Sequence, residues 1–338
     1  MMENETSRND DSVRIAMWSG PRNISTAMMR SWDARGDCVV SDEPLYGHYL
    51  STLNEEKRRE HPAYEAVMES QGVDCDRVIH ELTGEVPNGK CVWYQKHMAH
   101  HLTKECKRDW ILQLTNAFLI RNSAKMAMSF DKVIPNPRPE DLGLPQQLEL
   151  FERVYKETGE VPAVVDSESI LSNPVGMLNT LCEYLRVPFD RGMLSWQSGP
   201  RETDGVWASH WYGRVNQTTG FAKPAHEQPN IPKHLLTVVQ ECEAIESQLR
   251  KYALKPYAPG WIDKIRHEQS KLCLRSNDHH IHARIRYGSE PEDWGASENR
   301  CRDCGVAHGE IHVFGCDIER CIRCDGQACF CDCSHMIA

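Results

Sequence analysis

The sequence predicts an α/β fold, a P-loop-type parallel sheet covered by helices on both faces, with a small zinc-binding module at the C-terminal end. Short apolar runs of strand type alternate with amphipathic segments of helical spacing along the first 270 or so residues. Such alternation is typical of a parallel sheet with helices on both of its faces. The C-terminal module is predicted because eight of the fifteen cysteines lie between Cys301 and Cys333.

Length and charge limit the classes of function. The chain has 338 residues, 40% of them hydrophobic, which is enough for one sizeable α/β domain and a smaller unit. We divide it into a disordered tail at 1–12, an α/β domain at 13–272 and a Cys-rich module at 273–338. A formal net charge of −10 disfavours nucleic acid as a partner.

Membrane association is not expected either. No apolar run approaches the roughly 18 residues of a membrane span. The first twelve residues are polar and acidic, unlike a secretory signal or a transit peptide. We therefore expect a cytoplasmic protein.

The strongest local signal lies between residues 13 and 32. An apolar run at 13–18 predicts a strand, and the spacing of apolar residues from Ala27 to Trp32 predicts a helix that Ser25 or Thr26 could cap. Strand, tight turn and helix N-terminus together form an anion site, because backbone N–H groups and the helix dipole point at the ligand. Arg22 adds a planar fork that suits an oxyanion. We interpret the segment as a phosphate-binding loop.

The remaining elements follow in order. A second strand is expected at 38–41, and Asp42 and Glu43 leave its carboxyl end, where open α/β sheets bind ligands. The segment 54–82 predicts two helices with a break near Gly72. Further strands are expected at 92–95, 116–120 and 161–166, further helices at 126–130, 145–158, 174–185, 233–252 and 259–272, and a loop at 194–221.

A second anion site is predicted at the end of another strand. Arg121 ends a buried strand, and Ser129 lies about two turns along the next helix, so a guanidinium and a hydroxyl could hold one phosphate. Two phosphate sites on one sheet suit a nucleotide that carries a phosphate at each end of its ribose. A nucleoside-triphosphate loop would need Gly-Lys before its Ser or Thr, and this loop lacks that pair. Asp166, after an apolar strand, resembles a magnesium-site aspartate and keeps a small-molecule kinase or NTPase as the alternative.

On these residues the sequence resembles the PAPS-dependent sulfotransferases, and most of all bacterial sulfotransferase-like proteins. Residues 20–26 resemble the 5′-phosphosulfate loop, 119–122 with Ser129 resemble the 3′-phosphate motif, and 165–189 resemble the strand and helix that follow. The resemblance covers roughly residues 13 to 265. It implies transfer of a sulfuryl group from the co-substrate PAPS (3′-phosphoadenylyl sulfate) to a hydroxyl or amine of a small-molecule acceptor. The PAPS-binding residues that it implies are Gly20, Arg22, Asn23, Ser25, Thr26, Arg121 and Ser129.

The resemblance also suggests catalytic residues. Arg22 stands where the family usually has a lysine, so it can bind the phosphosulfate but cannot donate a proton in the same way. Glu43 resembles the glutamate of a Glu-Pro segment that is the proposed base in bacterial relatives. His97 matches the Lys-Thr-His placement of cytosolic relatives, and His100 and His101 beside it are expected at the surface. We favour Glu43 over His97 because a lone histidine is more often structural.

The chain lacks one motif of the family and leaves two other functions to consider. Arg214 is a candidate for completing the 3′-phosphate site, whose usual basic-glycine segment is not evident. Some bacterial relatives are described as related to aminotransferases, but this chain offers no cofactor-binding lysine motif for that chemistry. A scaffold that binds nucleotide without catalysis and acts through its zinc module remains a third alternative.

The cysteine module offers paired metal ligands. Cysteines two residues apart are typical of tetrahedral zinc, which supplies folding energy to short segments. The predicted ligands are Cys301, Cys304, His312, Cys316, Cys321, Cys324, Cys331 and Cys333. They would fill two sites; a single site of Cys301, Cys304, Cys321 and Cys324 is the more conservative interpretation, and disulfides are the alternative.

The module's charge bears on its partners. Residues 301–338 contain three arginines against six acidic residues, a balance of −3, which favours a protein partner over nucleic acid. A strand at 280–288 is expected to belong to this module. The seven scattered cysteines are expected to be reduced and inert: Cys38, Cys75, Cys91, Cys106, Cys182, Cys242 and Cys273.

Overall fold

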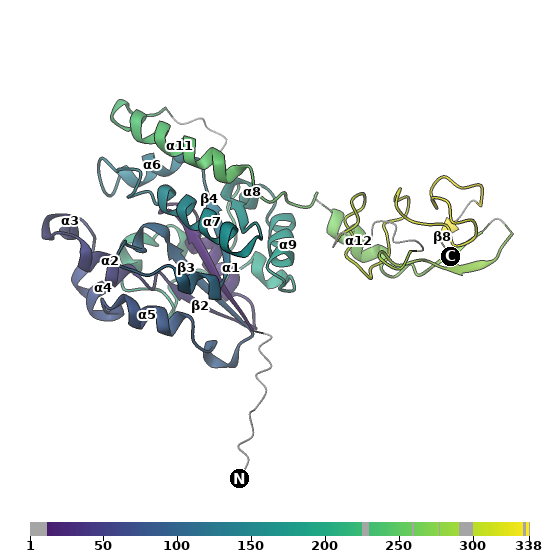
Figure 1. Ribbon diagram of the computed structural model, residues 1–338, viewed down its shortest axis with the longest axis horizontal. Helices are drawn as coiled ribbons and strands as arrows, with labels where there is room; N and C mark the ends of the chain where they lie inside the picture. The colour runs from purple at the N-terminus through teal and green to yellow at the C-terminus, as the bar shows by residue number, and fades with distance from the viewer. Residues whose placement is uncertain are drawn as a thin grey trace, which may run out of the picture. The chain divides into compact units, whose positions relative to one another are not determined.

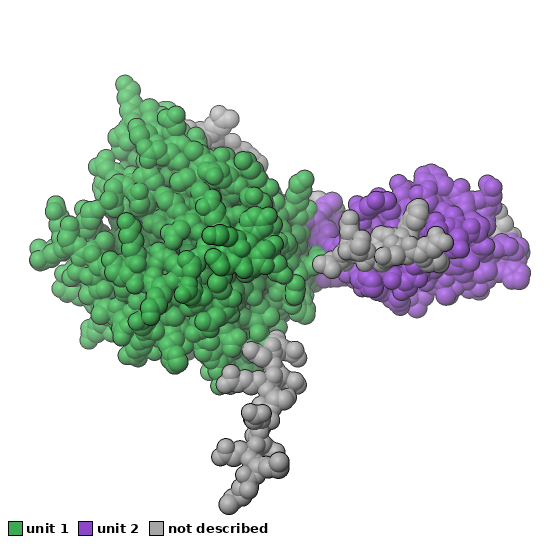
Figure 2. Space-filling model, viewed as in Figure 1, with its two compact units in different colours: residues 1–256 green, residues 257–338 purple. Residues whose placement is uncertain are grey.

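The computed structural model describes residues 12–224, 230–258, 260–276, 278–290 and 300–333, and the backbone of a short strand at 336–337. The chain forms two compact units, residues 1–256 and 257–338 (Figure 2). Most of the predicted tail, residues 1–11, lies outside the described ranges.

The second unit begins earlier than the predicted boundary at residue 273. Helix α12 (Trp261–Glu268) belongs to it. The Trp261 indole donates to the Cys304 carbonyl at 3.0 Å, and the Gln269 side-chain amide donates to the Ile311 carbonyl at 2.8 Å. The helix is therefore hydrogen-bonded to the cysteine-rich segment.

The first unit contains the predicted parallel sheet (Figure 1). Its five strands lie in the order β2-β3-β1-β4-β5, and each neighbouring pair is parallel. The strands are β1 (Val13–Ser19), β2 (Cys38–Asp42), β3 (Val92–Met98), β4 (Thr115–Ile120) and β5 (Ala163–Asp166). Each predicted strand is confirmed, with shifts of a few residues at its ends.

Helices cover both faces of the sheet, as predicted. Side chains alternate along β1, so Ile15 and Met17 pack on one face while Ala16 and Trp18 pack on the other. The first face contacts α1 (Ser25–Asp33), α2 (Tyr46–Thr52), α4 (Tyr64–Gln71), α8 (Ser167–Ser172) and α9 (Pro174–Tyr184). The second face contacts α5 (Cys75–Leu82), the 3₁₀ turn η3 (Asp109–Gln113) and α7 (Leu144–Thr158). A third apolar cluster joins α6 (Ser123–Asp131), α11 (Leu236–Arg250) and the start of α7.

The segment after β2 differs from the prediction of two helices. It forms three: α3 (Glu55–Arg59), α4 and α5. Ala63 has a left-handed backbone, φ 59°, which separates α3 from α4, and the Asp74 carboxylate caps α5 by accepting from the Asp76 N–H at 3.0 Å. The expected loop at 194–221 contains a short helix, α10 (Ala208–Trp211). The remaining 3₁₀ turns are η1 (Pro87–Gly89), η2 (Ala99–His101), η4 (Arg191–Leu194), η5 (Val215–Gln217) and η6 (Lys233–Leu235).

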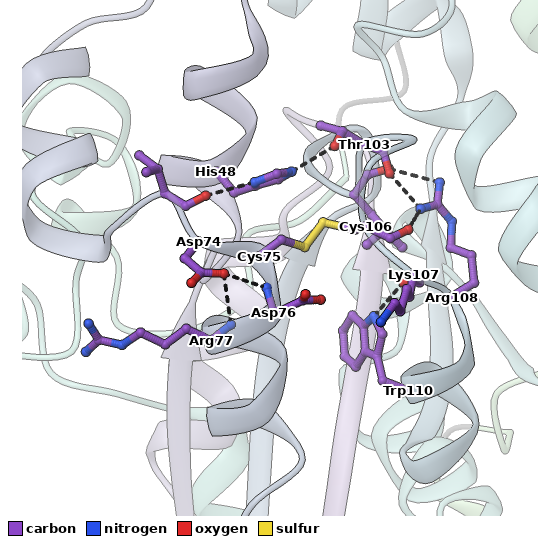
Figure 3. Close-up of a disulfide and its surroundings, with 12 residues drawn as sticks. His48, Asp74, Cys75, Asp76, Arg77, Thr103, Cys106, Lys107, Arg108 and Trp110 are labelled. Atoms are coloured by element: carbon purple, nitrogen blue, oxygen red, sulfur yellow. Dashed lines mark hydrogen bonds between the residues drawn. A yellow bond between two sulfur atoms is a disulfide. The ribbon is translucent and has the colours of Figure 1, made fainter.

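Two of the scattered cysteines form a disulfide, contrary to the expectation that all seven are reduced (Figure 3). Cys75 begins α5, and Cys106 lies in the loop between η2 and η3, with 6.1 Å between their Cα atoms. The pairing joins residues 31 apart, so no local sequence pattern signals it. The other five scattered cysteines are free thiols.

The second unit contains a small antiparallel sheet in the order β7-β6-β8. Its strands are β6 (Cys273–Arg275), β7 (Ile281–Ala283) and β8 (Met336–Ile337). The buried Arg284 guanidinium pairs with the carboxylates of Glu319 at 2.7 Å and Glu268 at 3.1 Å. Among the helices that the structure describes in either unit, none combines the length and apolarity that crossing a membrane requires.

Candidate active site and metal centres

A cavity of about 350 Å³ lies in the first unit. Residues 21–27 after β1 form one wall, and residues 211–223 contribute another. Glu43 follows β2, Arg121 follows β4 and Lys96 and Met98 come from the last residues of β3, so the cavity lies at the carboxyl ends of the strands. This is the edge at which open α/β sheets bind ligands.

The loop after β1 has an unusual backbone. Arg22 and Ile24 are left-handed, with φ of 60° and 50°. Gly20 lies so close to the backbone of residue 142 that a Cβ there would stand 2.2 Å from a carbonyl oxygen, so its role is steric. Gly20 does not line the cavity, whereas Arg22, Asn23, Ser25 and Thr26 do.

The start of α1 differs from the expected capped helix. Ile24 is the N-cap residue and no side chain caps the helix, so the prediction of a Ser25 or Thr26 cap is wrong. The first backbone N–H groups of a helix lack partners within the helix. At the edge of this cavity they can serve an anion.

Three arginines line the cavity beside this helix start: Arg22, Arg121 and Arg214. Arg22 Nε donates to Ser129 Oγ at 3.0 Å, and Arg121 donates to the Arg22 carbonyl. The structure thus brings the two predicted phosphate sites together. Burial and the charge of Arg214 lower the pKa of Arg22, and burial and the charge of Arg22 lower the pKa of Arg121. Among the described residues, no carboxylate lies within ion-pair distance of the three, although the charge of Glu168 opposes the decrease in the pKa of Arg121, so an anion would relieve their mutual repulsion.

A network around Lys96 lies in another part of the cavity. Lys96 Nζ donates to Asp42 Oδ1 at 2.8 Å, to Glu43 Oε1 at 2.7 Å and to the Tyr212 hydroxyl at 2.5 Å. Burial lowers the pKa of Lys96, but the carboxylates of Asp42 and Glu43 outweigh it and hold that pKa well above its usual value. Lys96 is therefore an ammonium.

Glu43 is the carboxylate of this network that lines the cavity. Its backbone is left-handed, φ 44°, a conformation that is uncommon for non-glycine residues. Burial raises the pKa of Glu43, although the charge of Lys96 opposes the increase. A raised pKa makes a carboxylate a better proton acceptor near neutral pH.

His97 lies outside the cavity, contrary to its expected role as a base. Its ring stacks on Trp18 with 4.4 Å between centroids, and its Nε2 lies 3.2 Å from the side-chain oxygen of Gln95. Burial lowers the pKa of His97 to about 3. Adjacent residues of a strand point to opposite faces of the sheet. Lys96 is on the face that leads to the cavity, and His97 is therefore on the other face.

Neutral imidazoles line the cavity near Glu43. His100 and His101 are buried, 8% and 2% exposed, so the expectation of surface positions is wrong. Burial lowers the pKa of His61 to about 4 and that of His100 to about 3, and it also lowers the pKa of His101. His101 Nδ1 lies 3.9 Å from Glu43 Oε2. Lys96, His61 and His101 were not predicted as site residues. The pleat parity of β3 could have indicated Lys96, and closeness to the end of β3 could have indicated His101, but His61 lies between α3 and α4 and has no such signal.

The eight predicted metal ligands form two groups of four in the second unit. Within each group the ligand atoms lie within 4.8 Å of one another. The groups are Cys301, Cys304, His312 and Cys316, and Cys321, Cys324, Cys331 and Cys333. The single site of Cys301, Cys304, Cys321 and Cys324 is therefore contradicted, because its two cysteine pairs belong to different groups.

His312 is held as a ligand would be. Its Nδ1 lies 3.4 Å from Cys304 Sγ, and its Nε2 lies 2.7 Å from Glu290 Oε1. A carboxylate on the second ring nitrogen is typical of zinc-bound histidine. Both groups consist of the thiolate and imidazole ligands that zinc prefers.

Two curated relatives come from Arabidopsis thaliana. "Branched-chain-amino-acid aminotransferase-like protein 1" is 32% identical over 218 residues, 64% of this chain and 38% of the relative. "Branched-chain-amino-acid aminotransferase-like protein 2" is 28% identical over 236 residues, 70% of this chain and 41% of the relative. The chain thus spans about two fifths of the length of these relatives.

The chain is also similar to solved sulfotransferase structures and matches one protein family. The sulfotransferase domain from the curacin biosynthetic pathway is 15% identical, with a TM-score of 0.42, and the match covers 72% of this chain and 99% of that one. A sulfotransferase from Alicyclobacillus acidocaldarius is 12% identical, with a TM-score of 0.38, covering 72% and 97%. Likeness at this level carries no argument about the site. Residues 13–242, however, match the family described as "Sulfotransferase domain", and the chain therefore belongs to the sulfotransferase family.

Proposed function

We propose that the protein transfers a sulfuryl group from PAPS to a hydroxyl of a small-molecule acceptor. One observation carries the proposal: a single cavity holds three arginines and an uncapped helix start in one part and the Glu43 carboxylate in another. The arginines suit a donor with several negative charges. The carboxylate suits the removal of an acceptor proton.

The proposed reaction is an in-line displacement. The acceptor oxygen forms a bond to sulfur while the bond from sulfur to the bridging oxygen breaks, and adenosine 3′,5′-bisphosphate leaves. Glu43 takes the acceptor proton. Arg22 and the N–H groups at the start of α1 stabilise the negative charge that develops on the leaving phosphate. Arg121, Ser129 and Arg214 are the proposed ligands of the 3′-phosphate.

Lys96 has a positioning role in this proposal. Its ammonium binds Glu43 Oε1, so Glu43 Oε2 is the oxygen available for a proton. An amine acceptor would need to arrive as the free base, and a hydroxyl needs no such step. The buried, neutral rings of His61, His100 and His101 also favour an uncharged acceptor, since they add no charge to that part of the cavity.

The kinase alternative depends on Asp166 as a magnesium ligand. Asp166 instead caps α8 by accepting from the Ser169 N–H at 3.0 Å, and it pairs with Arg250 at 3.1 Å. It does not line the cavity among the residues described there. These contacts favour a structural role. The aminotransferase-like names belong to relatives of which this chain spans about two fifths, so we propose no such activity for it.

We further propose that each group of four ligands in the second unit holds a structural Zn²⁺ ion. Two closed tetrahedral sites would stabilise a short segment with few aliphatic residues. A protein partner remains the proposal for this unit. The 74% exposed Phe330 and the acidic balance of the module support it.

Radiolabelled transfer tests the proposed function. The protein is incubated with ³⁵S-labelled PAPS and a panel of phenols, alcohols, sugars and amines. We expect label in at least one hydroxyl compound, together with stoichiometric release of adenosine 3′,5′-bisphosphate. The proposal would be contradicted if the protein transferred phosphate from ATP to the same panel but transferred no sulfuryl group from PAPS.

A further inference from the structure

A second set of potential metal ligands lies in the first unit, apart from the cysteine module. His48 of α2, Cys75 of α5 and Cys106 offer one ligand atom each, and these three atoms lie within 4.8 Å of one another (Figure 3). All three side chains are largely buried. A mixed group of two sulfurs and one imidazole, converging from three separate segments, is a chemistry that zinc prefers.

The hydrogen bonds of His48 fix which nitrogen can bind a metal. Its Nδ1 lies 3.0 Å from the Val73 carbonyl oxygen, which can only accept, so Nδ1 carries the proton. Its Nε2 then carries the lone pair, which accepts a hydrogen bond from the Thr103 hydroxyl at 2.8 Å, and a metal ion would take the place of that hydroxyl proton. A ring that donates Nδ1–H to a backbone carbonyl and presents Nε2 is the usual arrangement of a zinc-bound histidine.

We propose that Cys75, Cys106 and His48 form a redox-controlled zinc site, closed as a disulfide when oxidised and able to bind Zn²⁺ when reduced. A dithiol reductant supplies two electrons and two protons, the sulfur–sulfur bond breaks, and two thiols form while the reductant becomes a disulfide. Both thiols release their protons as the thiolates bind Zn²⁺. Three protein ligands leave a fourth position for water. Hard cations such as Mg²⁺ and Ca²⁺ are excluded by the lack of oxygen ligands in this set.

The site connects segments that also form the cavity. Tyr46 lies two residues before His48 on α2, and His101 lies five residues before Cys106; both line the cavity. The disulfide and the zinc ion would each tie α5 to the loop that follows η2. The reduced, metal-free form would lack that tie. This inference does not depend on the reaction proposed above.

Zinc content measured on the full-length chain tests the proposal. The protein is reduced with a phosphine, saturated with Zn²⁺ and freed of excess metal, and bound zinc is determined by elemental analysis. The matched variants are Cys75→Ser/Cys106→Ser and His48→Gln. Far-UV circular dichroism and a cooperative thermal transition check that each variant is folded, and thiol titration in denaturant confirms full reduction.

We expect reduced wild type to hold one more zinc ion per chain than the Cys75→Ser/Cys106→Ser variant. His48→Gln should lose that ion, since the loss of even an outer partner of a zinc ligand weakens a zinc site by about 10- to 100-fold. The comparison cancels whatever the second unit binds. Equal zinc in reduced wild type and the double variant would overturn the proposal. So would full retention of the additional ion by His48→Gln.

Discussion

Lys96 Nζ lies 2.7 Å from Glu43 Oε1 and 2.8 Å from Asp42 Oδ1, so one buried ammonium binds two consecutive carboxylates at the end of β2. Asp42 also accepts from the Tyr212 hydroxyl at 2.7 Å. Asp42 is therefore hydrogen-bonded to both Lys96 and Tyr212, while Glu43 is the carboxylate that lines the cavity. The Lys96–Asp42 pair is therefore structural, whereas Glu43 binds Lys96 through Oε1 and keeps Oε2 for a proton.

Glu43→Gln should lower turnover far more than donor affinity. The amide keeps the shape of the carboxylate but cannot accept the acceptor proton, and loss of a general base costs about 100-fold or more in kcat. Affinity for adenosine 3′,5′-bisphosphate should stay close to that of the wild type, because Lys96 remains neutralised by Asp42. Sulfuryl-transfer kinetics and calorimetry measure the two quantities.

Glu160→Gln is the control, since Glu160 is a surface carboxylate with a side chain 81% exposed. Near-wild-type turnover in Glu43→Gln would remove Glu43 as the base. His101, with its Nδ1 at 3.9 Å from Glu43, would then be the next group to examine.

Arg121→Ala should weaken donor binding. A charge-assisted hydrogen bond to a phosphate contributes about 1.5–3 kcal/mol, so the Kd for adenosine 3′,5′-bisphosphate should rise roughly 10- to 150-fold. Arg77→Ala, which removes a surface arginine with a side chain 77% exposed, should leave the Kd unchanged. An Arg121→Ala protein that binds the nucleotide as tightly as wild type would exclude Arg121 from the phosphate site.

The pH dependence of stability should report the buried histidines. The pKa of His97 is about 3 in the folded chain and about 6.5 in an unfolded one, so the unfolded chain binds more protons between these values. Stability is therefore lost as pH falls below about 6.5, by roughly 1.4 kcal/mol per pH unit for this one group.

His97→Gln should remove that contribution. Urea unfolding between pH 4 and pH 6 should show a slope of unfolding free energy against pH that is smaller by about 1.4 kcal/mol per unit, whatever the variant's absolute stability. The surface variant His210→Gln provides the comparison. An unchanged slope in His97→Gln would show that His97 is protonated in the folded protein.

Zinc stoichiometry should distinguish two metal sites from one. Cys316→Ser and Cys331→Ser each alter a different group of four ligands, so each should lower bound zinc by one ion per chain. Cys329→Ser is the matched control because Cys329 is exposed and belongs to neither group. If a single site of Cys301, Cys304, Cys321 and Cys324 existed instead, neither Cys316→Ser nor Cys331→Ser would release zinc.

The sequence predicted the sheet well because its strands are short apolar runs bounded by polar residues. Ile15 and Met17 mark β1 as buried on one face, and Ala16 and Trp18 mark it as buried on the other. The loop after β1 and the pair Arg121 and Ser129 could likewise be placed, because strand ends of a parallel sheet meet at one edge.

The features that were not predicted depend on contacts between segments that are distant in the sequence. Lys96 and His97 are neighbours in the sequence, and only the pleat of β3 decides that Lys96 reaches the cavity while His97 is packed behind it. The Cys75–Cys106 bond and the grouping of the eight module ligands also depend on contacts between residues that are far apart in the sequence. Spacing identified the ligand pairs, but it could not tell which pairs share a site.

The choice between a nucleotide with two separate phosphate sites and ATP is the most direct test of the central claim. Thermal unfolding is measured with adenosine 3′,5′-bisphosphate and, separately, with ATP and Mg²⁺ at equal concentrations. A ligand at about 100 times its Kd stabilises a protein by roughly 2.7 kcal/mol, which is readily seen as a rise in Tm. We predict a rise with adenosine 3′,5′-bisphosphate that is clearly smaller in Arg121→Ala, and little or none with ATP and Mg²⁺. A larger rise with ATP and Mg²⁺ than with adenosine 3′,5′-bisphosphate would contradict the account.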